Sequence, residues 1–285
     1  MDGRVYNTLI LSDLHLGAET SHAREATRVL KEKRFERLIL LGDIFADLNF
    51  ARLTKEHWKF LGYIRKLSNP KRNVEVVWVE GNHDRGLANI MSHLVGVRVY
   101  QQYAWEYCGL RHSAIHGHQF DGFQVNRMRL SRWGTSLYLR LQKMDLKGKP
   151  IARWIDQANT RWLRMSTKVA RGALRYAAQR GVQRVFCGHT HEALHVERDG
   201  IHYYNSGGWV GARLTYLTID KQGVEIHVYQ QRTDDRDSSE KRGEADSAVT
   251  EFADPAGLLE DVEYESVGGG REFNGWNAGD RAEFS

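Results

Sequence analysis

The sequence predicts an α/β protein built around a sandwich of β-strands, and two observations support that prediction. Over the first 120 residues, short apolar runs alternate with segments whose apolar residues have helical spacing. This alternation is typical of parallel sheets covered by helices. The early apolar runs also end in polar residues, and open α/β sheets bind their ligands at the carboxyl ends of their strands. We therefore expect a functional site at one edge of a sheet.

The first part of the chain contains three expected strands, over 5–11, 37–41 and 74–79. Between them, 23–34 and 53–67 have the apolar spacing of helices. Each expected strand stops at a short polar group, and these groups are Ser12-Asp13, Gly42-Asp43 and Glu80-Gly81-Asn82.

The later part of the chain changes character twice. Strands are expected over 97–115, whereas 123–180 is helical in pattern and rich in Trp, Leu and Arg. Strand-like runs then return at 184–187, 201–205, 214–219 and 224–229, with a hairpin turn at Gln222-Gly223. We therefore assign 1–122 and 181–232 to the core, 123–180 to a helical lid inserted into it, and 233–285 to a tail.

Charge is distributed unevenly along the chain, whose formal net charge is +5. Residues 121–185 carry 15 basic and 3 acidic side chains, and this excess favours an anionic partner such as a phosphate, a nucleotide, nucleic acid or anionic lipid. A solvated helical face is the alternative, since Arg is also a good helix former. Residues 233–285 carry 5 basic and 15 acidic side chains, and their low apolar content predicts disorder.

Composition excludes several classes of protein. Apolar residues make up 41% of the chain and charged residues 27%, which excludes collagen-like and wholly disordered chains. No stretch reaches the roughly 18 uncharged apolar residues of a membrane-spanning helix. Residues 1–7 lack the pattern of a signal peptide, and the two cysteines, Cys108 and Cys187, are too few for a disulfide framework. We therefore expect a cytoplasmic protein.

Five short blocks of potential ligands follow apolar runs. Any one of them is a weak indication, because a single strand-end His is usually a hydrogen-bonded structural residue. Together they would meet at one sheet edge with oxygen and imidazole ligands and no thiolate, a set that suits Mn²⁺, Fe, Zn²⁺ or Mg²⁺. Seven candidate ligands exceed one tetrahedral site and indicate two ions that share a carboxylate. The blocks are Asp13-Leu14-His15, Gly42-Asp43, Gly81-Asn82-His83-Asp84, His116-Gly117-His118 and Gly188-His189-Thr190-His191.

The order of these blocks, D-x-H, G-D, G-N-H-D, H-G and G-H-T-H, resembles the signature of the calcineurin-like metallophosphoesterases. The resemblance covers roughly residues 5–230 and implies a four-layer αββα sandwich that hydrolyses phosphoric esters or anhydrides. Within that family the chain looks most like the UDP-2,3-diacylglucosamine pyrophosphatase group. That likeness rests on Phe120-Asp121 after His116-Gly117, on the helical insertion, and on 205–210.

The resemblance also implies which residues hold the metals. Asp13, His15 and His191 would hold one ion, Asn82, His116 and His189 the other, and Asp43 would bridge the two. We expect two divalent ions, Mn²⁺ first, with Zn²⁺, Fe²⁺ or Mg²⁺ as alternatives.

The chemistry of such a centre gives the expected mechanism. Two cations neutralise phosphate charge and lower the pKa of a water between them, and the resulting bridging hydroxide attacks phosphorus. His83 would lie beside the substrate phosphate and, when protonated, stabilise the transition state or donate to the leaving oxygen. Asp84 is expected either to orient His83 or to cap the following helix.

Substrate contacts are expected from the lid and from the fourth block. The apolar residues of the lid favour packing onto the core or, alternatively, a groove for an acyl chain or nucleobase. A basic amphipathic lid also favours peripheral contact with an anionic membrane, such as the inner membrane. The candidate substrate contacts are Asn126, Arg127, Arg129, Arg132, Lys168 and His118.

Three features depart from the pyrophosphatase group. His118 stands where that group has Asp, His83 stands where the lipid A enzymes have Arg, and Gly208-Trp209-Val210-Gly211 lacks two acids. None is a candidate metal ligand, so they bear on the substrate and not on hydrolysis. The preferred substrate is a nucleotide-diphospho-lipid such as UDP-2,3-diacylglucosamine. The alternative is a general phosphodiesterase or nucleotide phosphatase of the same fold; a nuclease ranks lower, because no nucleic-acid-binding motif is recognised.

Overall fold

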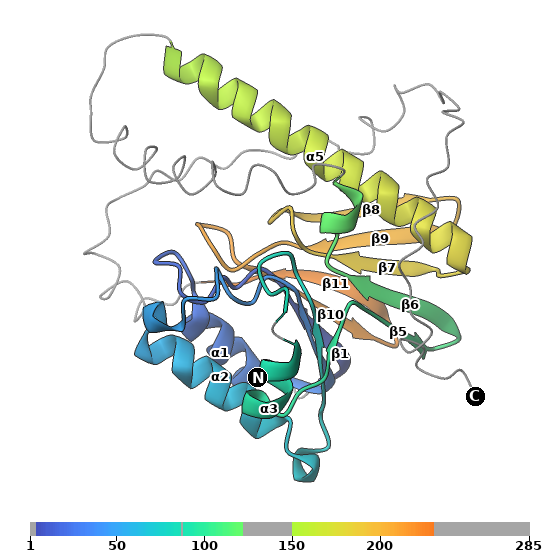
Figure 1. Ribbon diagram of the computed structural model, residues 1–285. Coiled ribbons are helices and arrows are strands. Elements are labelled where there is room, and N and C mark those ends of the chain that lie inside the picture. The colour runs from blue at the N-terminus through green and yellow to red at the C-terminus, as the bar shows by residue number, and fades with distance from the viewer. Residues whose placement is uncertain (1–3, 87, 122–149, 231–285) are drawn as a thin grey trace.

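The computed structural model describes residues 4–86, 88–121 and 150–230 (Figure 1). The predictions for 122–149, which include Asn126, Arg127, Arg129 and Arg132, and for the tail 233–285 lie outside the described residues. None of the described helices is both long enough and apolar enough to cross a bilayer.

The first sheet has the strand order β11-β10-β1-β2-β3-β4. The strands β1, β2, β3 and β4 run parallel. β10 pairs antiparallel with β1, and β11 pairs antiparallel with β10 at the edge. The strands are β1 (Val5–Leu11), β2 (Arg34–Leu41), β3 (Glu75–Val79), β4 (Val99–Tyr100), β10 (Thr215–Asp220) and β11 (Gly223–Val228).

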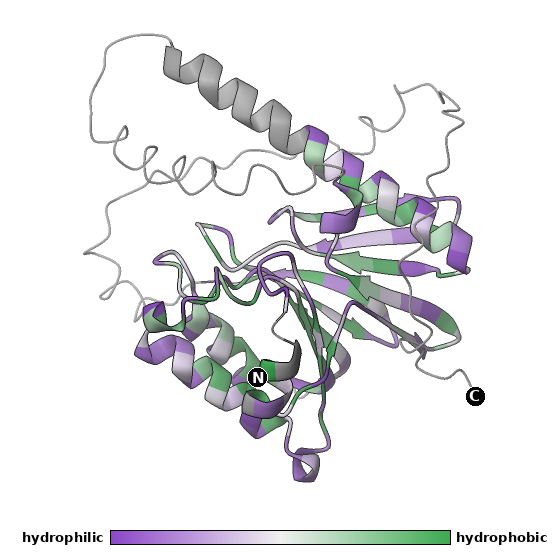
Figure 2. Cartoon of the chain, in the orientation of Figure 1, coloured by the Kyte–Doolittle hydropathy of each residue, from purple (hydrophilic) through white to green (hydrophobic). Residues whose placement is uncertain are grey.

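Three helices cover one face of this sheet: α1 (Ala23–Glu32), α2 (Lys55–Leu67) and α3 (Ala88–Val95). They pack their apolar side chains against the alternate strand residues that point to that face, as the period-two geometry of a strand requires. Figure 2 shows α1 and α2 with hydrophobic residues toward the sheet and hydrophilic residues outside. The start of α2 is fixed by Thr54, whose hydroxyl accepts from the His57 N–H while the His57 ring accepts from the Thr54 N–H.

The second sheet has the order β5-β6-β7-β9-β8, with β6, β7 and β9 parallel. Its inner face packs on the first sheet through a buried cluster that includes Ile39, Val77 and Leu217 from one sheet and Trp105 and Phe186 from the other. The strands are β5 (Gln102–Tyr107), β6 (Leu110–Ile115), β7 (Arg184–Cys187), β8 (Ala193–Arg198) and β9 (Ile201–Ser206).

The outer face of the second sheet is covered by α5 (Pro150–Arg180). Val169, Ala173 and Ala177 of this helix are fully buried against Ile115 and Val185 of the sheet. The layers are therefore helix, sheet, sheet, helix, which confirms the predicted α/β sandwich. We predicted 123–180 as a lid, but its carboxyl-terminal part is one of these layers. Its alanine-rich face packs on the second sheet and shields that sheet from water.

The predicted strands and helices of the core are present, with ends that shift by a few residues. The structure gives bounds to the helix expected after Asp84, which is α3, and adds a strand that we did not predict, β8. β8 and β9 form a hairpin whose turn is Asp199-Gly200, both with positive φ (53° and 73°), as tight two-residue hairpin turns require.

Candidate metal centre

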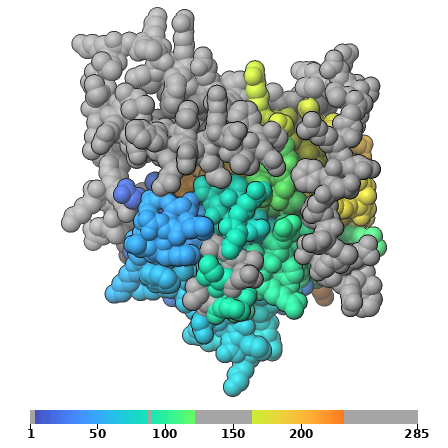
Figure 3. All heavy atoms as spheres, viewed as in Figure 1, coloured from blue at the N-terminus to red at the C-terminus, as the bar shows by residue number. Residues whose placement is uncertain are grey.

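The polar blocks that follow the strands meet at one edge of the two sheets. Asp13 follows β1, Asp43 follows β2, His116 follows β6, and His189 follows β7 by two residues. In Figure 3 the teal residues that follow β3 lie between blue residues of the first part of the chain and the green residues that follow them in the sequence. The two halves of the sandwich therefore contribute to the same site.

Hydrogen bonds tie these loops to one another. The Asp13 N–H donates to the Gly42 carbonyl (3.0 Å), and the Asp13 carboxylate accepts from the His189 N–H (3.0 Å). The Asp43 carboxylate accepts from the His83 N–H (2.8 Å). Each carboxylate thus keeps one oxygen on a backbone donor, which leaves its second oxygen for the centre of the site.

Five candidate ligands adopt a left-handed backbone conformation, which is uncommon for residues other than glycine and is concentrated at functional sites. This conformation turns the side chains of adjacent or alternate residues back toward one point. The residues and their φ angles are Asp13 (52°), His15 (47°), Asp43 (49°), His189 (69°) and His191 (57°). The loops also approach so closely that a Cβ added at Gly81 would overlap the Asp43 carboxylate, and one at Gly188 would lie 2.5 Å from the Asp13 Oδ2 atom.

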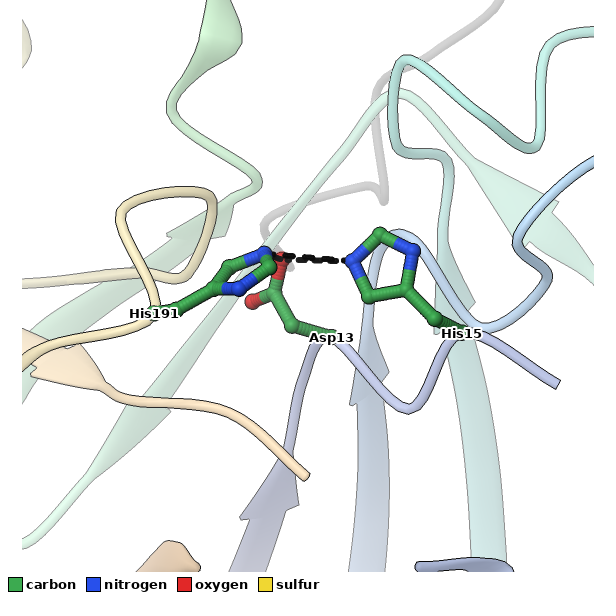
Figure 4. A group of neighbouring side chains, drawn as sticks. All are labelled: Asp13, His15 and His191. Atoms are coloured by element: carbon green, nitrogen blue, oxygen red, sulfur yellow. Dashed lines mark hydrogen bonds and ion pairs between the residues drawn. The ribbon is translucent and has the colours of Figure 1, made fainter. Parts of the chain in front are cut away.

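The first donor group is Asp13, His15 and His191 (Figure 4). The His191 Nε2 atom lies 3.1 Å from the Asp13 Oδ1 atom and 3.1 Å from the His15 Nε2 atom. The His15 Nε2 atom lies 3.8 Å from the Asp13 Oδ1 atom. Figure 4 shows the two rings pointing toward each other, with Asp13 between them. Three donor atoms within this spacing are what a single divalent cation needs.

The second donor group is Asp43, His116 and His189. The Asp43 Oδ2 atom lies 3.3 Å from the His116 Nε2 atom. The other ring nitrogen of His116, Nδ1, donates to the Leu41 carbonyl (3.0 Å), so Nε2 is the ring nitrogen that faces the carboxylate. Asp43 also belongs to a third group with His15 and His83, and it therefore stands between the two donor groups.

Asn82 completes the predicted ligand set. Its side-chain oxygen is buried, and within the described parts of the chain it has no hydrogen-bond partner. The Asp13 Oδ1 and His116 Nε2 atoms are also buried, and apart from the ion-pair neighbours given above they have no hydrogen-bond partner among the described residues. Leaving a buried acceptor without a donor costs about 1–3 kcal/mol. Buried oxygen and imidazole nitrogen atoms of this kind are donors that fit divalent cations.

The two aspartates set the electrostatics of the site. Burial opposes ionisation of Asp43, but the facing histidines, His116 first, hold the pKa of Asp43 below its ordinary value. Although burial disfavours charge on His116, Asp43 raises the pKa of His116 to about 9, and Asp13 likewise raises the pKa of His191. The carboxylates thus draw positive charge into a buried place. Burial lowers the pKa of His15 to about 4, so this ring is neutral at pH 7, as a metal ligand must be.

The Asp84 carboxylate does not contact the His83 ring, as it would if it oriented that ring. The His83 Nδ1 atom donates to the Ala46 carbonyl (2.7 Å), which leaves Nε2 toward the site, 3.9 Å from the Asp43 Oδ2 atom. The buried Asp84 carboxylate instead accepts the N–H groups of Ile44 (3.0 Å) and Phe45 (2.9 Å), and it fixes the chain just after Asp43. Burial and the nearby Asp43 raise the pKa of Asp84 to about 7.

The candidate substrate contacts are only partly described. Lys168 is exposed on α5. His118 is half-buried beside the centre, its ring centroid 5.5 Å from that of His116, and its Nε2 atom lies 3.0 Å from the Arg85 Nη2 atom. Burial, with the neighbouring His116, lowers the pKa of His118 to about 3.

The sequence analysis assigned no role to two residues that lie at the site. Arg85 immediately follows the G-N-H-D block, and Asp121 was noted only as part of a motif. The Asp121 Oδ2 atom lies 3.0 Å from the His189 Nε2 atom. A carboxylate at one ring nitrogen leaves the other nitrogen of His189 as the ligand atom, a common arrangement around protein-bound metals.

Comparisons with known proteins agree with this architecture. Residues 7–223 match the model of the calcineurin-like phosphoesterase superfamily domain. No curated protein sequence matches the chain.

Solved structures similar to this chain include three that cover 78% of it. The Escherichia coli phosphoesterase Yfce is 14% identical, with 99% of its own chain covered and a TM-score of 0.44. An archaeal phosphodiesterase is 16% identical, with 98% covered and a TM-score of 0.43. The Entamoeba histolytica protein Vps29, in complex with Zn²⁺, is 12% identical, with 97% covered and a TM-score of 0.40.

The match to the family model spans most of the chain and includes the elements that carry all seven candidate ligands. The two groups of Asp and His donors suit the metal ions on which phosphoester hydrolysis can depend. The chain therefore belongs to the calcineurin-like phosphoesterase superfamily, and it is a metal-dependent phosphoesterase.

Proposed function

We propose that this enzyme hydrolyses phosphodiester or phosphoanhydride bonds at a centre of two divalent cations. The observation that carries the proposal is the position of Asp43, which belongs both to a donor group with His15 and to one with His116 and His189. Asp13 and His191 complete the first cation site with His15, and Asn82 completes the second. Mn²⁺ is the first choice, and Zn²⁺, Fe²⁺ and Mg²⁺ suit the same donors.

When bound, the cations supply Lewis acidity, which neutralises phosphoryl oxygens and lowers the pKa of water. Hydrolysis forms one bond from phosphorus to a water-derived oxygen and breaks the bond to the leaving oxygen, which keeps the electron pair. His83 is placed to hold a proton at its Nε2 atom near that leaving oxygen, because its Nδ1 atom is fixed on Ala46 and a third of its side chain is exposed. Asp84 acts on this chemistry only through the backbone that follows Asp43.

Two substrate classes are compatible with such a centre. Membership of the superfamily supports a general phosphodiesterase or nucleotide phosphatase. The narrower assignment, hydrolysis of UDP-2,3-diacylglucosamine, depends on Phe120-Asp121, on the helical insertion and on 205–210, and the departures at His118, Gly208 and Gly211 count against it. We therefore favour the general activity.

The test is hydrolysis with Mn²⁺ added or chelated, on UDP-2,3-diacylglucosamine and bis-p-nitrophenyl phosphate in parallel. We expect metal-dependent cleavage of the generic diester, and a loss of about 10²-fold in kcat on replacing His83 with Ala while the bound metal is retained. A far faster cleavage of the lipid nucleotide would establish the narrower substrate. Absence of hydrolysis of both substrates by protein shown to contain metal would reject the proposed function.

A further inference from the structure

Arg85 is an exposed cation that the structure holds in one place. Its Nη2 atom lies 3.0 Å from the His118 Nε2 atom. Within the described ranges, no carboxylate pairs with Arg85, unlike Arg37 with Glu75 or Arg52 with Asp47. Its positive charge is therefore not neutralised by an acid of the described fold.

The contact also defines the role of His118. A guanidinium can only donate hydrogen bonds, so the His118 Nε2 atom accepts, and the proton of this ring is on Nδ1. With its acceptor occupied by Arg85, His118 is not itself a cationic phosphate contact. Instead, His118 holds the Arg85 side chain in one direction. Because the side chain is already ordered, it loses less rotamer entropy when it binds a ligand.

The pair stands directly beside one of the two donor groups. The His118 ring centroid lies 5.5 Å from that of His116 and 6.3 Å from that of His189. Arg85 is also two residues after His83, and the chain there begins at the carboxyl end of β3. The guanidinium is thus at the rim of the metal centre, next to the Asp43–His116–His189 group.

A phosphate held at the metal centre would have its charge neutralised there. An additional fixed guanidinium beside it matches a second anionic group of the same substrate, and a phosphate fits best because guanidinium binds two of its oxygens at once. We propose that Arg85, positioned by His118, binds the second phosphate of the substrate and makes the enzyme select phosphoanhydrides over diesters with one phosphate. This inference rests on the proposed function and narrows its substrate class.

The test compares two substrates that share a uridine: diuridine 5′-diphosphate and the p-nitrophenyl ester of uridine 5′-phosphate. In the anhydride, water adds one oxygen to a phosphorus, the P–O–P bond of that phosphorus breaks, and two molecules of uridine 5′-phosphate form. For Arg85→Ala we expect kcat/KM on the anhydride to fall about 10- to 100-fold, mainly through KM, with a change below about threefold on the ester.

A binding measurement keeps the test independent of turnover. The methylene analogue of diuridine diphosphate, in which CH₂ replaces the bridging oxygen, is titrated calorimetrically into metal-loaded wild type and Arg85→Ala. We expect its Kd to rise by the same 10- to 100-fold. His118→Ala should reproduce part of this loss with unchanged metal content, and His118→Gln should recover it, because the Gln amide oxygen reaches about as far as Nε2.

Arg111→Ala is the matched control, an exposed arginine at the start of β6 whose partner is Glu106. It should leave both substrates unaffected. Equal losses on the two substrates for Arg85→Ala, or an unchanged Kd for the analogue, would overturn the assignment. If the metal-loaded wild type hydrolyses neither substrate, the proposed function fails, whereas the calorimetric comparison still decides whether Arg85 binds a second phosphate.

Discussion

Histidines are buried in two regions of this molecule, and their surroundings differ. At the metal centre, His116 faces the Asp43 carboxylate, which raises its pKa to about 9 against the effect of burial. Between the two sheets, His112 is stacked between Trp105 and Phe186, with ring centroids 5.0 and 5.8 Å away, and burial lowers its pKa to about 4. Burial is equal, so the neighbouring carboxylate decides the charge.

The comparison also shows which observation identifies a ligand. The Nε2 atoms of both His116 and His112 are buried and lack a hydrogen-bond partner among the described residues. An unpartnered nitrogen therefore does not by itself indicate a metal site. What distinguishes the centre is the convergence of carboxylate, imidazole and left-handed backbone at one point.

The largest expected effect follows from removing the carboxylate that the two donor groups share. Asp43→Ala should lower metal-dependent turnover by about 10³-fold or more, because it removes the carboxylate that belongs to donor groups at both proposed cation sites. Metal analysis and thermal unfolding distinguish loss of metal from loss of the fold. The bound metal should fall, whereas unfolding should remain cooperative. Wild-type turnover in this variant would remove the two-cation centre.

The second effect concerns His112. Because its pKa is lower in the folded than in the unfolded protein, the unfolded state takes up the proton first, and stability falls as the pH drops from about 6.5 to about 4. The loss amounts to about 3 kcal/mol. His112→Phe keeps the aromatic stack without a titrating group, so its free energy of unfolding should change less over this range. Identical pH profiles of urea unfolding for the two proteins would contradict the neutral buried ring.

The smallest effect concerns the support of a ligand. Asp121→Asn removes the charge beside the His189 Nε2 atom but preserves shape, and we expect metal affinity to fall about tenfold in competition with a chelator. Asp220→Asn, whose partner is Arg4 at the far end of the first sheet, serves as control and should leave the affinity unchanged. Equal affinities for Asp121→Asn and the wild type would show that Asp121 does not orient the ligand.

Much of the fold could be predicted because a buried strand is visible in the sequence as a short continuous run of apolar residues. β1 and β7 are found at their predicted ends, since each is a continuous apolar run that stops at a polar block. β8 was missed because only Val196 along it is buried, so it has no apolar pattern. The dipeptide Asp199-Gly200 was the available signal for that hairpin.

The site could be predicted only in part, for a physical reason. Candidate ligands can be recognised by residue type and by their place after strands. Six of the seven meet in the two donor groups, and the seventh, Asn82, follows β3. Residues that act through a ligand or a neighbour depend on distances across the fold. Asp121 reaches His189 from 68 positions away, and Asp84 reaches the backbone of Ile44 from 40. The spacing of residues along one sequence does not indicate contacts between positions that are so far apart.

The length of α5 has a mechanical consequence. Its carboxyl-terminal half is fixed on the second sheet, while its amino-terminal end extends beyond the strands (Figure 1). From Ser166 to Pro150 the helix measures about 24 Å, so each degree of tilt at the fixed half displaces the far end by about 0.4 Å. A Cβ at Gly172 would lie 2.6 Å from the Cβ atom of Phe120, in the turn that also carries His118 and Asp121. A small tilt of α5 about its fixed half would therefore move its amino-terminal end by several times as much as the contact with the turn beside the metal centre.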